Sequence, residues 1–401
     1  MSPEVGVPQN RESMDKSRHT IAHVITESEP FGGSQRNTLL TLQGLVRDGY
    51  QTELVCGPGG RLIPEAQAIG VPVHVVPDLV RQVDLGKDFR AVLHLYRLFH
   101  SQRYSVVHTH ATKAGLLGRL AARWVGVPWI IHTFHSVPFE MNGDLKSKCY
   151  IALERLIGSF TDSLACVGEV LRQQIAAWKI APEEKLVTIY SGIDFARYVP
   201  TYPPREMKQQ LGLEEAWPIV GCIGRLCEQK AQQYLVESIA FLRERYPQIR
   251  LLLVGEGGLK PLLEQRIQEL GLSSQVFLLG ERDNIADLLN VCDIYAMSSL
   301  WEGVGRALTE AMYWRLPVVA TPVNGVTELI SHEETGLLIP PRDPKALAAA
   351  IDRLASDSEL AQRLGINAHQ KAKDLMDGRR MISAIEELYE RLIERTAVKT
   401  A

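Results

Sequence analysis

The sequence predicts an α/β protein made of two Rossmann-like domains that face each other across a cleft. Short apolar runs rich in β-branched residues alternate with amphipathic helical stretches along the whole chain, which is the pattern of parallel sheets covered on both faces. At 401 residues the chain exceeds the size at which one hydrophobic core usually keeps growing. A proline-bearing stretch, Tyr198–Pro204, separates two successive sets of strand-like runs, and we place the domain boundary there.

The first set contains the expected strands Ile21–Thr26, Gln51–Cys56, Val73–Val76, Val106–Thr109, Trp129–Thr133, Ser163–Val167 and Val187–Tyr190. Helices are expected between them, including Gln35–Arg47 and Asp88–Arg103. In the second of these helices, the spacing predicts a packed face made of Phe89, Val92, Tyr96 and Phe99.

The second set begins at Ile219–Ile223 and continues through Leu251–Val254, Val276–Leu279, Asp293–Met297 and Pro317–Ala320. Beyond Asp343 the sequence is helical, and its last segment has the pattern of one long amphipathic helix. We therefore expect an irregular N-terminus over residues 1–18 and domains over 19–197 and 198–378. The helix over residues 379–401 should cross back to pack on the first domain.

Composition and charge narrow the class of protein. Hydrophobic residues at 45% and charged residues at 23% are ordinary for a globular chain, and six cysteines without a Cys-x-x-Cys motif are expected to be reduced thiols. The polar first 18 residues favour a cytoplasmic protein. The charge is +2 over residues 1–200 and −5 over the remainder. This asymmetry is too small to indicate nucleic acid, but it is compatible with an anionic acceptor or with peripheral attachment at the inner face of the membrane.

The segment Trp301–Met312 has the most informative pattern, because a strand, a glycine loop and a helix follow one another there. Gly303 and Gly305 let the backbone approach a ligand closely, and the helix start offers free N–H groups to an anion. Glu302 in the loop and Glu310 two turns into the helix can face one cleft. Together they can accept hydrogen bonds from a sugar and from a ribose, which predicts a nucleotide-sugar site. An acidic helix start that only complements the macrodipole would explain Glu302 but not Glu310.

Two further turns are candidates for anion binding. Arg225 and Lys230 flank the turn after Ile219–Ile223, where two cations can neutralise a diphosphate and stabilise the charge on a leaving group. A solvated surface pair is the alternative. Gly33 opens a helix after the first strand, which gives either an anion-approach geometry from the other domain or simply a tight turn. Neither turn is a Walker loop or a dinucleotide fingerprint.

Histidines gather at the ends of two expected strands, in His108-Thr109-His110 and His132-Thr133-Phe134-His135. Ligands bind at the carboxyl edge of such sheets. Because no helical histidine pair and no carboxylate partner accompany them, we do not expect a metal site. We interpret one or two of them as hydrogen-bonding groups towards sugar hydroxyls or phosphate, and His108 as a candidate core residue.

These residues together resemble glycosyltransferase family 4, the retaining enzymes of the GT-B fold, over almost the whole chain. The C-terminal half carries an ordered series of matching segments: Gly224-Arg225-Leu226 with Lys230, Leu253–Gly257, Phe277–Gly280, Glu302 with Glu310-Ala311-Met312, Pro317–Thr321 and Glu328. The stretch Val107–Gly115 is similar to bacterial surface-polysaccharide members. The departures are Ala231 and Asn324 where glycines are usual, and Val304 where an aromatic residue is common.

The resemblance implies a role for each matching position. The catalytic residues would be His135, Glu302, Arg225 and Lys230. The donor-binding residues would be Gly33, Arg225, Lys230, Glu302, Gly303, Val304, Gly305, Leu308 and Glu310. Among these, Glu302 is expected to contact the donor sugar, Glu310 the ribose and the two cations the diphosphate. His110 and Lys113 are candidates for the acceptor site, Lys113 through an acceptor phosphate.

The implied reaction moves a hexose-type sugar from a nucleotide diphosphate donor, such as a UDP-sugar, to a glycan, lipid-linked or small-molecule acceptor. Retention of configuration is commonly explained by a front-face reaction in which the leaving phosphate helps to deprotonate the acceptor. Neither a classical nucleophile nor a cofactor or metal is then required. The alternatives are a nucleotide-sugar 2-epimerase of the same fold and a non-catalytic nucleotide-sugar-binding protein. The form of the Glu302–Glu310 segment disfavours the first, and the presence of every catalytic position disfavours the second.

Overall fold

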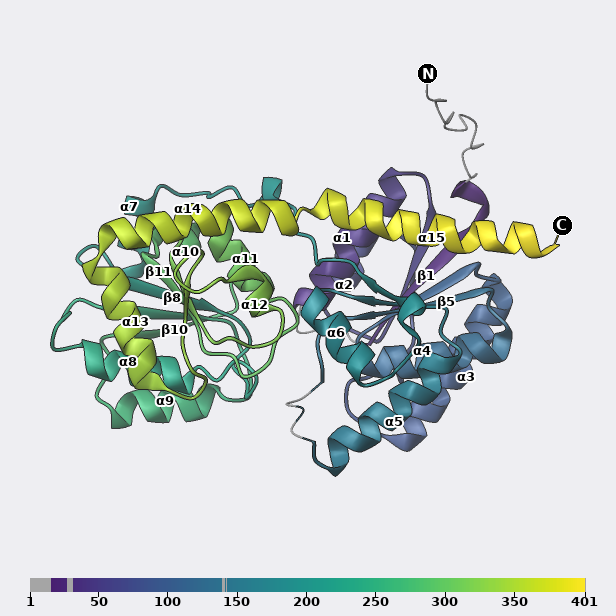
Figure 1. Ribbon diagram of the computed structural model, residues 1–401, viewed down its shortest axis with the longest axis horizontal. Helices are drawn as coiled ribbons and strands as arrows, with labels where there is room; N and C mark the ends of the chain where they lie inside the picture. Colours follow the sequence, from purple (N-terminus) through teal and green to yellow (C-terminus); the bar gives the residue numbers. More distant parts are fainter. Residues whose placement is uncertain (1–15, 27–31, 139–140, 142, 401) are drawn as a thin grey trace, which may run out of the picture.

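The structure is a computed structural model that describes residues 16–26, 32–138, 141 and 143–400. Two parallel sheets, each enclosed by helices, form two domains side by side, and two consecutive helices run along one side of both (Figure 1). The predicted fold class, two Rossmann-like domains with a C-terminal helix that crosses back, is confirmed. No helix among the described residues is long and apolar enough to cross a membrane.

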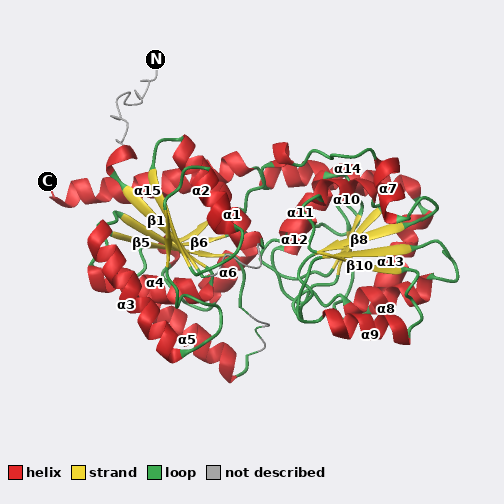
Figure 2. Ribbon diagram, turned by 180° about the vertical axis from the view of Figure 1, so that it is seen from behind, coloured by secondary structure: helices red, strands yellow, loops and turns green. Residues whose placement is uncertain are grey.

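The N-terminal sheet has seven strands in the order β3-β2-β1-β4-β5-β6-β7. Its strands are β1 Thr20–Ile25, β2 Gln51–Cys56, β3 Val73–Val75, β4 Val106–His110, β5 Trp129–Phe134, β6 Ser163–Cys166 and β7 Leu186–Thr188. Its helices are α1 Gly33–Arg47, α2 Leu62–Ala68, α3 Leu85–Gln102, α4 Thr112–Val125, α5 Leu145–Ser159 and α6 Glu169–Ala177. Helices lie on both faces of each sheet (Figure 2), which is why central strands such as β4 are buried along their whole length.

The C-terminal sheet has six strands in the order β10-β9-β8-β11-β12-β13. Its strands are β8 Ile219–Ile223, β9 Arg250–Val254, β10 Val276–Gly280, β11 Ile294–Met297, β12 Val318–Ala320 and β13 Leu337–Leu338. Its helices are α7 Pro204–Leu211, α8 Gln233–Leu242, α9 Lys260–Glu269, α10 Ile285–Val291, α11 Arg306–Tyr313, α12 Val326–Leu329, α13 Pro344–Ser356 and α14 Ser358–Leu375. The sequence did not reveal β13, because two residues carry no periodic signal.

The chain passes between the domains twice, and the two passages lie against each other. The amide of Ile193 donates to the carbonyl of Met376 at 2.8 Å, and the amide of Gly378 donates to the carbonyl of Ile193 at 3.1 Å. From there α15, Gly378–Thr400, runs back over the N-terminal domain (Figure 1). Its buried side chains join one core cluster with β1, β4 and β5, and they are Met381, Ile382, Ile385, Leu388, Tyr389, Leu392 and Ile393.

Two local expectations are corrected. Helix α3 buries Ala91, Val92, Leu95 and Phe99, whereas Phe89 is 62% exposed and Tyr96 is 37% exposed. The helix packs mainly on α4, so a stripe that includes the small Ala91 turns inward and the predicted stripe lies partly in solvent.

At the N-terminus, residues Lys16–Arg18 form a 3₁₀ helix rather than irregular chain, and Lys16 pairs with Glu386 of α15 at 3.5 Å. The remainder of the segment expected to be irregular, residues 1–15, lies outside the described residues.

Candidate active site

The loop between β11 and α11 presents Glu302 towards the N-terminal domain. The Glu302 carboxylate is only 5% exposed, and its Oε1 atom accepts a hydrogen bond from the Ser299 hydroxyl at 2.7 Å. The same oxygen forms an ion pair with the ammonium group of Lys230. Gly305, the residue before α11, has φ of +81°, which an L side chain adopts only at a cost. The loop therefore holds its carboxylate in one position before any ligand arrives.

The turn after β8 lies against this loop. The Gln229 side chain donates to the carbonyl of Trp301 at 2.8 Å, and the Ser298 hydroxyl donates to the carbonyl of Lys230 at 3.0 Å. Arg225 is partly buried on the same turn and lies 3.4 Å from the Gln229 side-chain oxygen. Two cations and one carboxylate thus come together at the carboxyl edge of the second sheet, where α/β folds bind ligands.

Two departures from the family pattern have a local explanation. Ala231 has φ of +50° and Asn324 has φ of +36°, so both positions lie in the left-handed region that favours glycine. Asparagine is among the residues that tolerate this region, and the Asn324 amide also donates to the carbonyl of Glu302 at 3.0 Å. The asparagine at position 324 therefore keeps in place the loop between β11 and α11, which we call the donor loop.

Glu310 lies on α11 with 5% exposure, and its Oε1 atom accepts a hydrogen bond from the Arg306 guanidinium at 3.0 Å. The hydroxyl of Tyr198, from the segment that links the domains, donates to the same oxygen. Burial raises the pKa of Tyr198, so this hydroxyl keeps its proton. Sequence reasoning missed both residues. No pattern marks Tyr198, but the i,i+4 spacing of Arg306 and Glu310 is a signal that could have found Arg306.

A cavity of ≈ 320 Å³ receives residues from both domains and is lined by Tyr198 and Arg306, the two partners of Glu310, but not by Glu310 itself. Its lining includes Arg36 and Leu40 of α1, Tyr198, Asn284 before α10, and Arg306. A volume of this size is at the lower end of the range of small-molecule sites. The cavity thus lies next to the partners of the residue that was expected to bind the ribose.

The N-terminal domain reaches the donor loop at two glycines. A Cβ atom at Gly303 would overlap the carbonyl oxygen of His135, so that only glycine permits this approach. Gly33, at the start of α1, faces Arg306, whose Cβ atom would lie 3.9 Å from a Cβ at this glycine. His135 and Gly33 therefore lie where the N-terminal domain contacts the loop and the helix that carry Glu302 and Glu310.

The remaining donor-loop residues contribute differently. The Val304 side chain is 5% exposed and packs on Gly168 of the N-terminal domain, and the Leu308 side chain is fully buried in a core cluster. These two side chains pack beneath the loop and support it. Only the backbone atoms of Val304 and Leu308 could therefore contact a donor.

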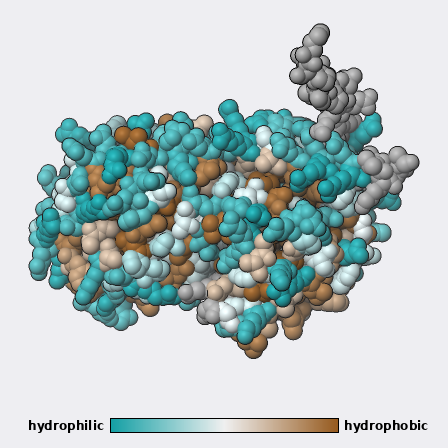
Figure 3. Space-filling view, in the orientation of Figure 1, coloured by the Kyte–Doolittle hydropathy of each residue, from teal (hydrophilic) through white to brown (hydrophobic). Residues whose placement is uncertain are grey.

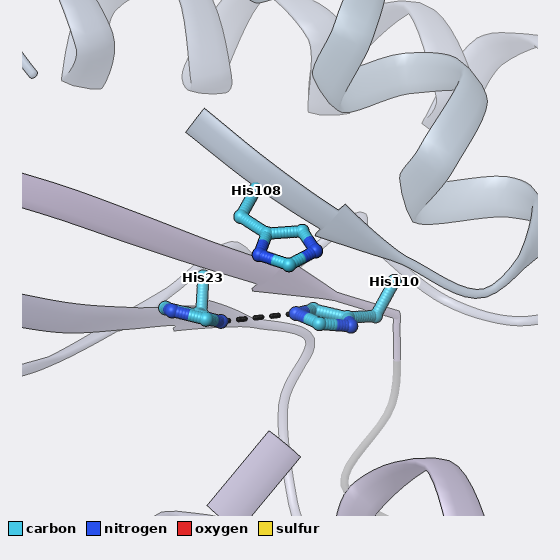
Figure 4. Close-up of side chains that lie close together, drawn as sticks. All are labelled: His23, His108 and His110. Carbon is cyan, nitrogen blue, oxygen red and sulfur yellow. Dashed lines mark hydrogen bonds between the residues drawn. The ribbon is translucent and has the colours of Figure 1, made fainter. Parts of the chain in front are cut away.

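The four histidines predicted to gather are divided between the two faces of the sheet. His132 points towards α4, where its Nδ1 atom lies 2.9 Å from the Thr109 hydroxyl. His108 and His110 point to the opposite face and stack at 4.4 Å between ring centroids. His23 of β1, which the sequence did not single out, joins them, as Figure 4 shows. His108 is fully buried, as expected of a core residue.

Both acceptor-site candidates have partners within the protein. His110 is 1% exposed, and its two ring nitrogens already face His23 and His135, so it has no free group for an acceptor. The Lys113 ammonium group lies 2.5 Å from the Asp88 carboxylate and also bonds to the carbonyl of Gln82. In the free protein Lys113 therefore connects α4 to α3.

Nitrogens of His23, His108 and His110 lie within 4.8 Å of one another, close enough to hold a metal ion. A metal needs lone pairs that converge on one point. Here the nitrogens are instead engaged pairwise, His23 with His110 at 3.0 Å, and His108 with the Tyr389 and Thr133 hydroxyls at 2.6 and 2.7 Å. We interpret the cluster as a hydrogen-bonded array. His23 could have been found from the sequence, because the first and fourth strands are neighbours in a Rossmann sheet.

Comparisons with known proteins agree with this geometry. Residues 204–371 match the family described as glycosyl transferases group 1, and residues 32–192 match the glycosyl transferase 4-like domain. The UDP-Gal:alpha-D-GlcNAc-diphosphoundecaprenol alpha-1,3-galactosyltransferase of Escherichia coli is 30% identical over 383 residues, 93% of this chain and 98% of that enzyme. The capsular polysaccharide biosynthesis glycosyltransferase CapM of Staphylococcus aureus is 23% identical over 81% of this chain and 87% of its own length. The crystal structure of Anabaena HepE in complex with UDP and glucose shares the fold, with a TM-score of 0.81, 24% identity, and coverage of 93% of this chain and 100% of its own.

Proposed function

The chain belongs to the glycosyl transferases of group 1, enzymes of the GT-B fold, and from this premise we propose that it transfers a hexose from UDP to a lipid-linked sugar with retention of configuration. The observation that carries the proposal is that the buried Glu302, paired with Lys230, lies in a loop that the His135 backbone contacts from the N-terminal domain, with Glu310 on the helix that follows. The relatives are transferases, which favours transfer over the epimerase and the binding-protein alternatives.

Donor binding would exchange contacts that the protein already makes. The Lys230 ammonium group would move from Glu302 to a phosphate oxygen, and Glu302 would then accept a hydrogen bond from a hydroxyl of the donor sugar. Glu310 would release the Tyr198 hydroxyl and accept from the ribose. Each new bond to a charged group contributes roughly 1.5–3 kcal/mol in such a site. The free enzyme thus keeps its carboxylates satisfied until the donor replaces their partners.

The proposed reaction needs no group beyond these residues and the two substrates. The bond between the anomeric carbon and the phosphate oxygen breaks, and the electron pair stays on the phosphate. The acceptor hydroxyl oxygen attacks the anomeric carbon from the same face, and its proton passes to the departing phosphate. Arg225 and Lys230 would stabilise the charge that collects there, which is the role that a metal ion has in other transferases. We therefore propose metal-independent transfer.

The donor and acceptor classes are proposed from the first relative. That enzyme is named for UDP-galactose and for a sugar on diphosphoundecaprenol, and it matches this chain over nearly its whole length. We propose a UDP-hexose donor and an acceptor sugar joined through a diphosphate to a polyprenol. Such a lipid would require the enzyme to work at a membrane surface.

Helix α5 offers a surface suited to that task. Leu145, Cys149, Ala152 and Leu156 are exposed at helical spacing, with Leu145 77% and Leu156 64% exposed, and the exposed Lys148 lies beside them. Figure 3 shows apolar side chains at the lower edge of the N-terminal domain, where α5 lies in Figure 1. An apolar stripe flanked by a cation is typical of helices that lie in a membrane interface. We propose that this face contacts anionic lipid.

Vesicle sedimentation tests the membrane contact. Leu156→Ser should lower the fraction of protein bound to anionic phospholipid vesicles several-fold. Leu262→Ser is the control, because Leu262 on α9 of the other domain is 51% exposed. Equal binding of the two variants would contradict the contact.

Activity is tested with purified protein, UDP-hexoses and a short-chain polyprenyl-diphosphate sugar as acceptor, with EDTA present. We expect transfer with UDP-sugars, and a loss of the thermal shift by UDP in Glu310→Ala. Glu228→Ala, an exposed carboxylate near the same cleft, should behave as the wild type. No shift with UDP but a clear one with GDP or ADP would overturn the donor assignment, and retained donor hydrolysis without transfer to this lipid would overturn the acceptor.

A further inference from the structure

A continuous hydrogen-bonded array leads from His135 at the cleft to the C-terminal helix, and we call it the histidine chain. Its members are His135, His110, His23, Tyr389, His108 and Thr133. The nitrogen Nε2 of His135 lies 3.2 Å from Nδ1 of His110, and Nε2 of His110 lies 3.0 Å from Nδ1 of His23 (Figure 4). The Tyr389 hydroxyl lies 3.2 Å from Nε2 of His23 and 2.6 Å from Nδ1 of His108. Nε2 of His108 ends the chain 2.7 Å from the Thr133 hydroxyl.

The strands place these residues together by register. His23 of β1 is the direct neighbour of His108 on β4, and His110 is the direct neighbour of Thr133 on β5. Because side chains two residues apart share a face, His108 and His110 both point towards α15. Tyr389 enters from α15 and is fully buried. Residues from four elements, more than 360 positions apart in sequence, thus form one array.

Burial keeps every imidazole in the chain neutral. Desolvation lowers the pKa of His23 to about 3 and that of His135 to about 4, and it lowers the pKa values of His108 and His110 well below 6.5. Burial likewise raises the pKa of Tyr389, so its hydroxyl keeps one proton to donate.

A neutral imidazole has one donor nitrogen and one acceptor nitrogen. The protons of the chain therefore have only two consistent arrangements, one running from Thr133 to His135 and the other in reverse. Any mixed arrangement would leave two N–H groups or two lone pairs facing each other between rings, or the Tyr389 O–H without an acceptor in the chain.

We propose that His110, His23, Tyr389 and His108 are positioning residues that hold His135 in one tautomer, with its proton on Nδ1. In this arrangement the Thr133 hydroxyl donates to His108, and each ring donates onward until Nδ1–H of His110 meets Nε2 of His135. The Nδ1–H group of His135, which no member of the chain accepts, is then available to a phosphate or hydroxyl oxygen of the ligand. The inference rests on the proposed role of His135 beside the donor.

The chain also gives α15 a direct part in the site. Tyr389 is the only member that comes from beyond the N-terminal sheet, and its hydroxyl alone connects His23 with His108. Removing that oxygen would leave both ring nitrogens without their partner and release the constraint on the order of protons. The tautomer of His135 would then become mixed, although the residue itself is unchanged.

The test compares Tyr389→Phe with Tyr50→Phe in the full-length enzyme. Tyr50 is a matched control because it is 4% exposed, its ring packs 6.3 Å from that of Tyr389, and its hydroxyl bonds to Glu390 of the same helix outside the chain. The ¹⁵N signals of His135 should show a single neutral Nδ1–H form in the wild type and in Tyr50→Phe, and a mixture in Tyr389→Phe. We expect kcat to fall about tenfold in Tyr389→Phe alone, with the KM for the donor within about twofold of wild type.

Several outcomes would overturn the proposal. They are a mixed or Nε2–H form of His135 in the wild type, stoichiometric zinc in the purified protein, or equal kcat in the two tyrosine variants. If Tyr389→Phe fails to fold, the wild-type nitrogen signals decide alone. Full activity of His135→Ala would refute the proposed role of His135, while the tautomer measurement would still test the chain itself.

Discussion

Replacement of Lys230 by alanine should affect stability and catalysis by separate mechanisms. The substitution removes the cation that neutralises Glu302 and leaves that carboxylate, 5% exposed, with only the Ser299 hydroxyl as a side-chain partner. Breaking a fully buried ion pair from one side costs about 3–5 kcal/mol. Since the Lys230 side chain is 17% exposed, solvent reaches the site, and we expect the free energy of unfolding to fall by about 2–3 kcal/mol.

A second substitution separates the two effects. Glu302→Gln keeps the shape of the side chain and an oxygen for Ser299 but removes the unpaired charge. The double variant Lys230→Ala with Glu302→Gln should therefore recover most of the lost stability, about 2 kcal/mol. It should not recover transfer. Loss of the phosphate contact should lower kcat by a factor on the order of 10²–10³ in both variants.

Urea unfolding of the free protein and initial-rate kinetics measure the two quantities. Lys260→Ala is the control, because Lys260 pairs with Glu256 at 2.9 Å on the exposed surface, where such a pair contributes less than about 1 kcal/mol. If Lys230→Ala is no less stable than Lys260→Ala, or if Glu302→Gln fails to restore stability, the reasoning about the buried carboxylate is wrong.

Three further predictions follow from single contacts. Tyr198→Phe removes the hydroxyl that donates a hydrogen bond to the Glu310 carboxylate in the free protein. UDP should therefore bind about fivefold more tightly, as measured by calorimetry. Weaker binding would show that the Tyr198 hydroxyl contacts the ligand instead. The Glu328 carboxylate accepts hydrogen bonds from the backbone amides of Glu169 and Val170 across the domain boundary, at 2.8 and 2.7 Å. Glu328→Ala removes these bonds, so solution scattering should show a more open free enzyme. An unchanged scattering profile would contradict this. The five buried histidines have folded-state pKa values below 6.5, so the unfolded chain binds more protons as the pH falls below 6.5. The free energy of unfolding, measured with urea, should be highest above pH 6.5 and should fall by about 1 kcal/mol per histidine between pH 7 and 5.5. An equal free energy of unfolding at the two pH values would show that these rings are not buried.

The sequence predicted the fold well because parallel strands covered on both faces form continuous apolar runs. The strand Gln51–Cys56 and the strand Ile219–Ile223 have the predicted bounds. The prediction was wrong where tertiary packing determines which face of a helix is buried. The amphipathic pattern of α3 admitted two stripes, and only contact with α4 selects the one that contains Ala91.

Candidate site residues could be named from the sequence where they belong to short characteristic segments. Residues that reach the site only through tertiary contacts could not. Glu302 and Lys230 lie 72 positions apart and still meet, because both follow strands of one sheet and reach its carboxyl edge. Lys113 has the same kind of position after β4, yet Asp88 on the preceding helix takes up its charge. Tyr198 and Tyr389 enter from the linker and from the last helix, and the spacing of residues indicates neither.

Because α15 packs on the first domain, part of the core of that domain forms only after the second domain has been synthesised. The side chains that complete the core around Ile21, Val106 and Ile131 belong to residues 381–393, which are synthesised after the second domain. One face of the first sheet must therefore stay uncovered while the whole second domain is translated. A chain that terminates before α15 would expose apolar side chains and leave His23 and His108 without the Tyr389 hydroxyl, and such exposed apolar surface promotes aggregation. Completion of the first domain thus depends on residues that follow the second domain in the sequence.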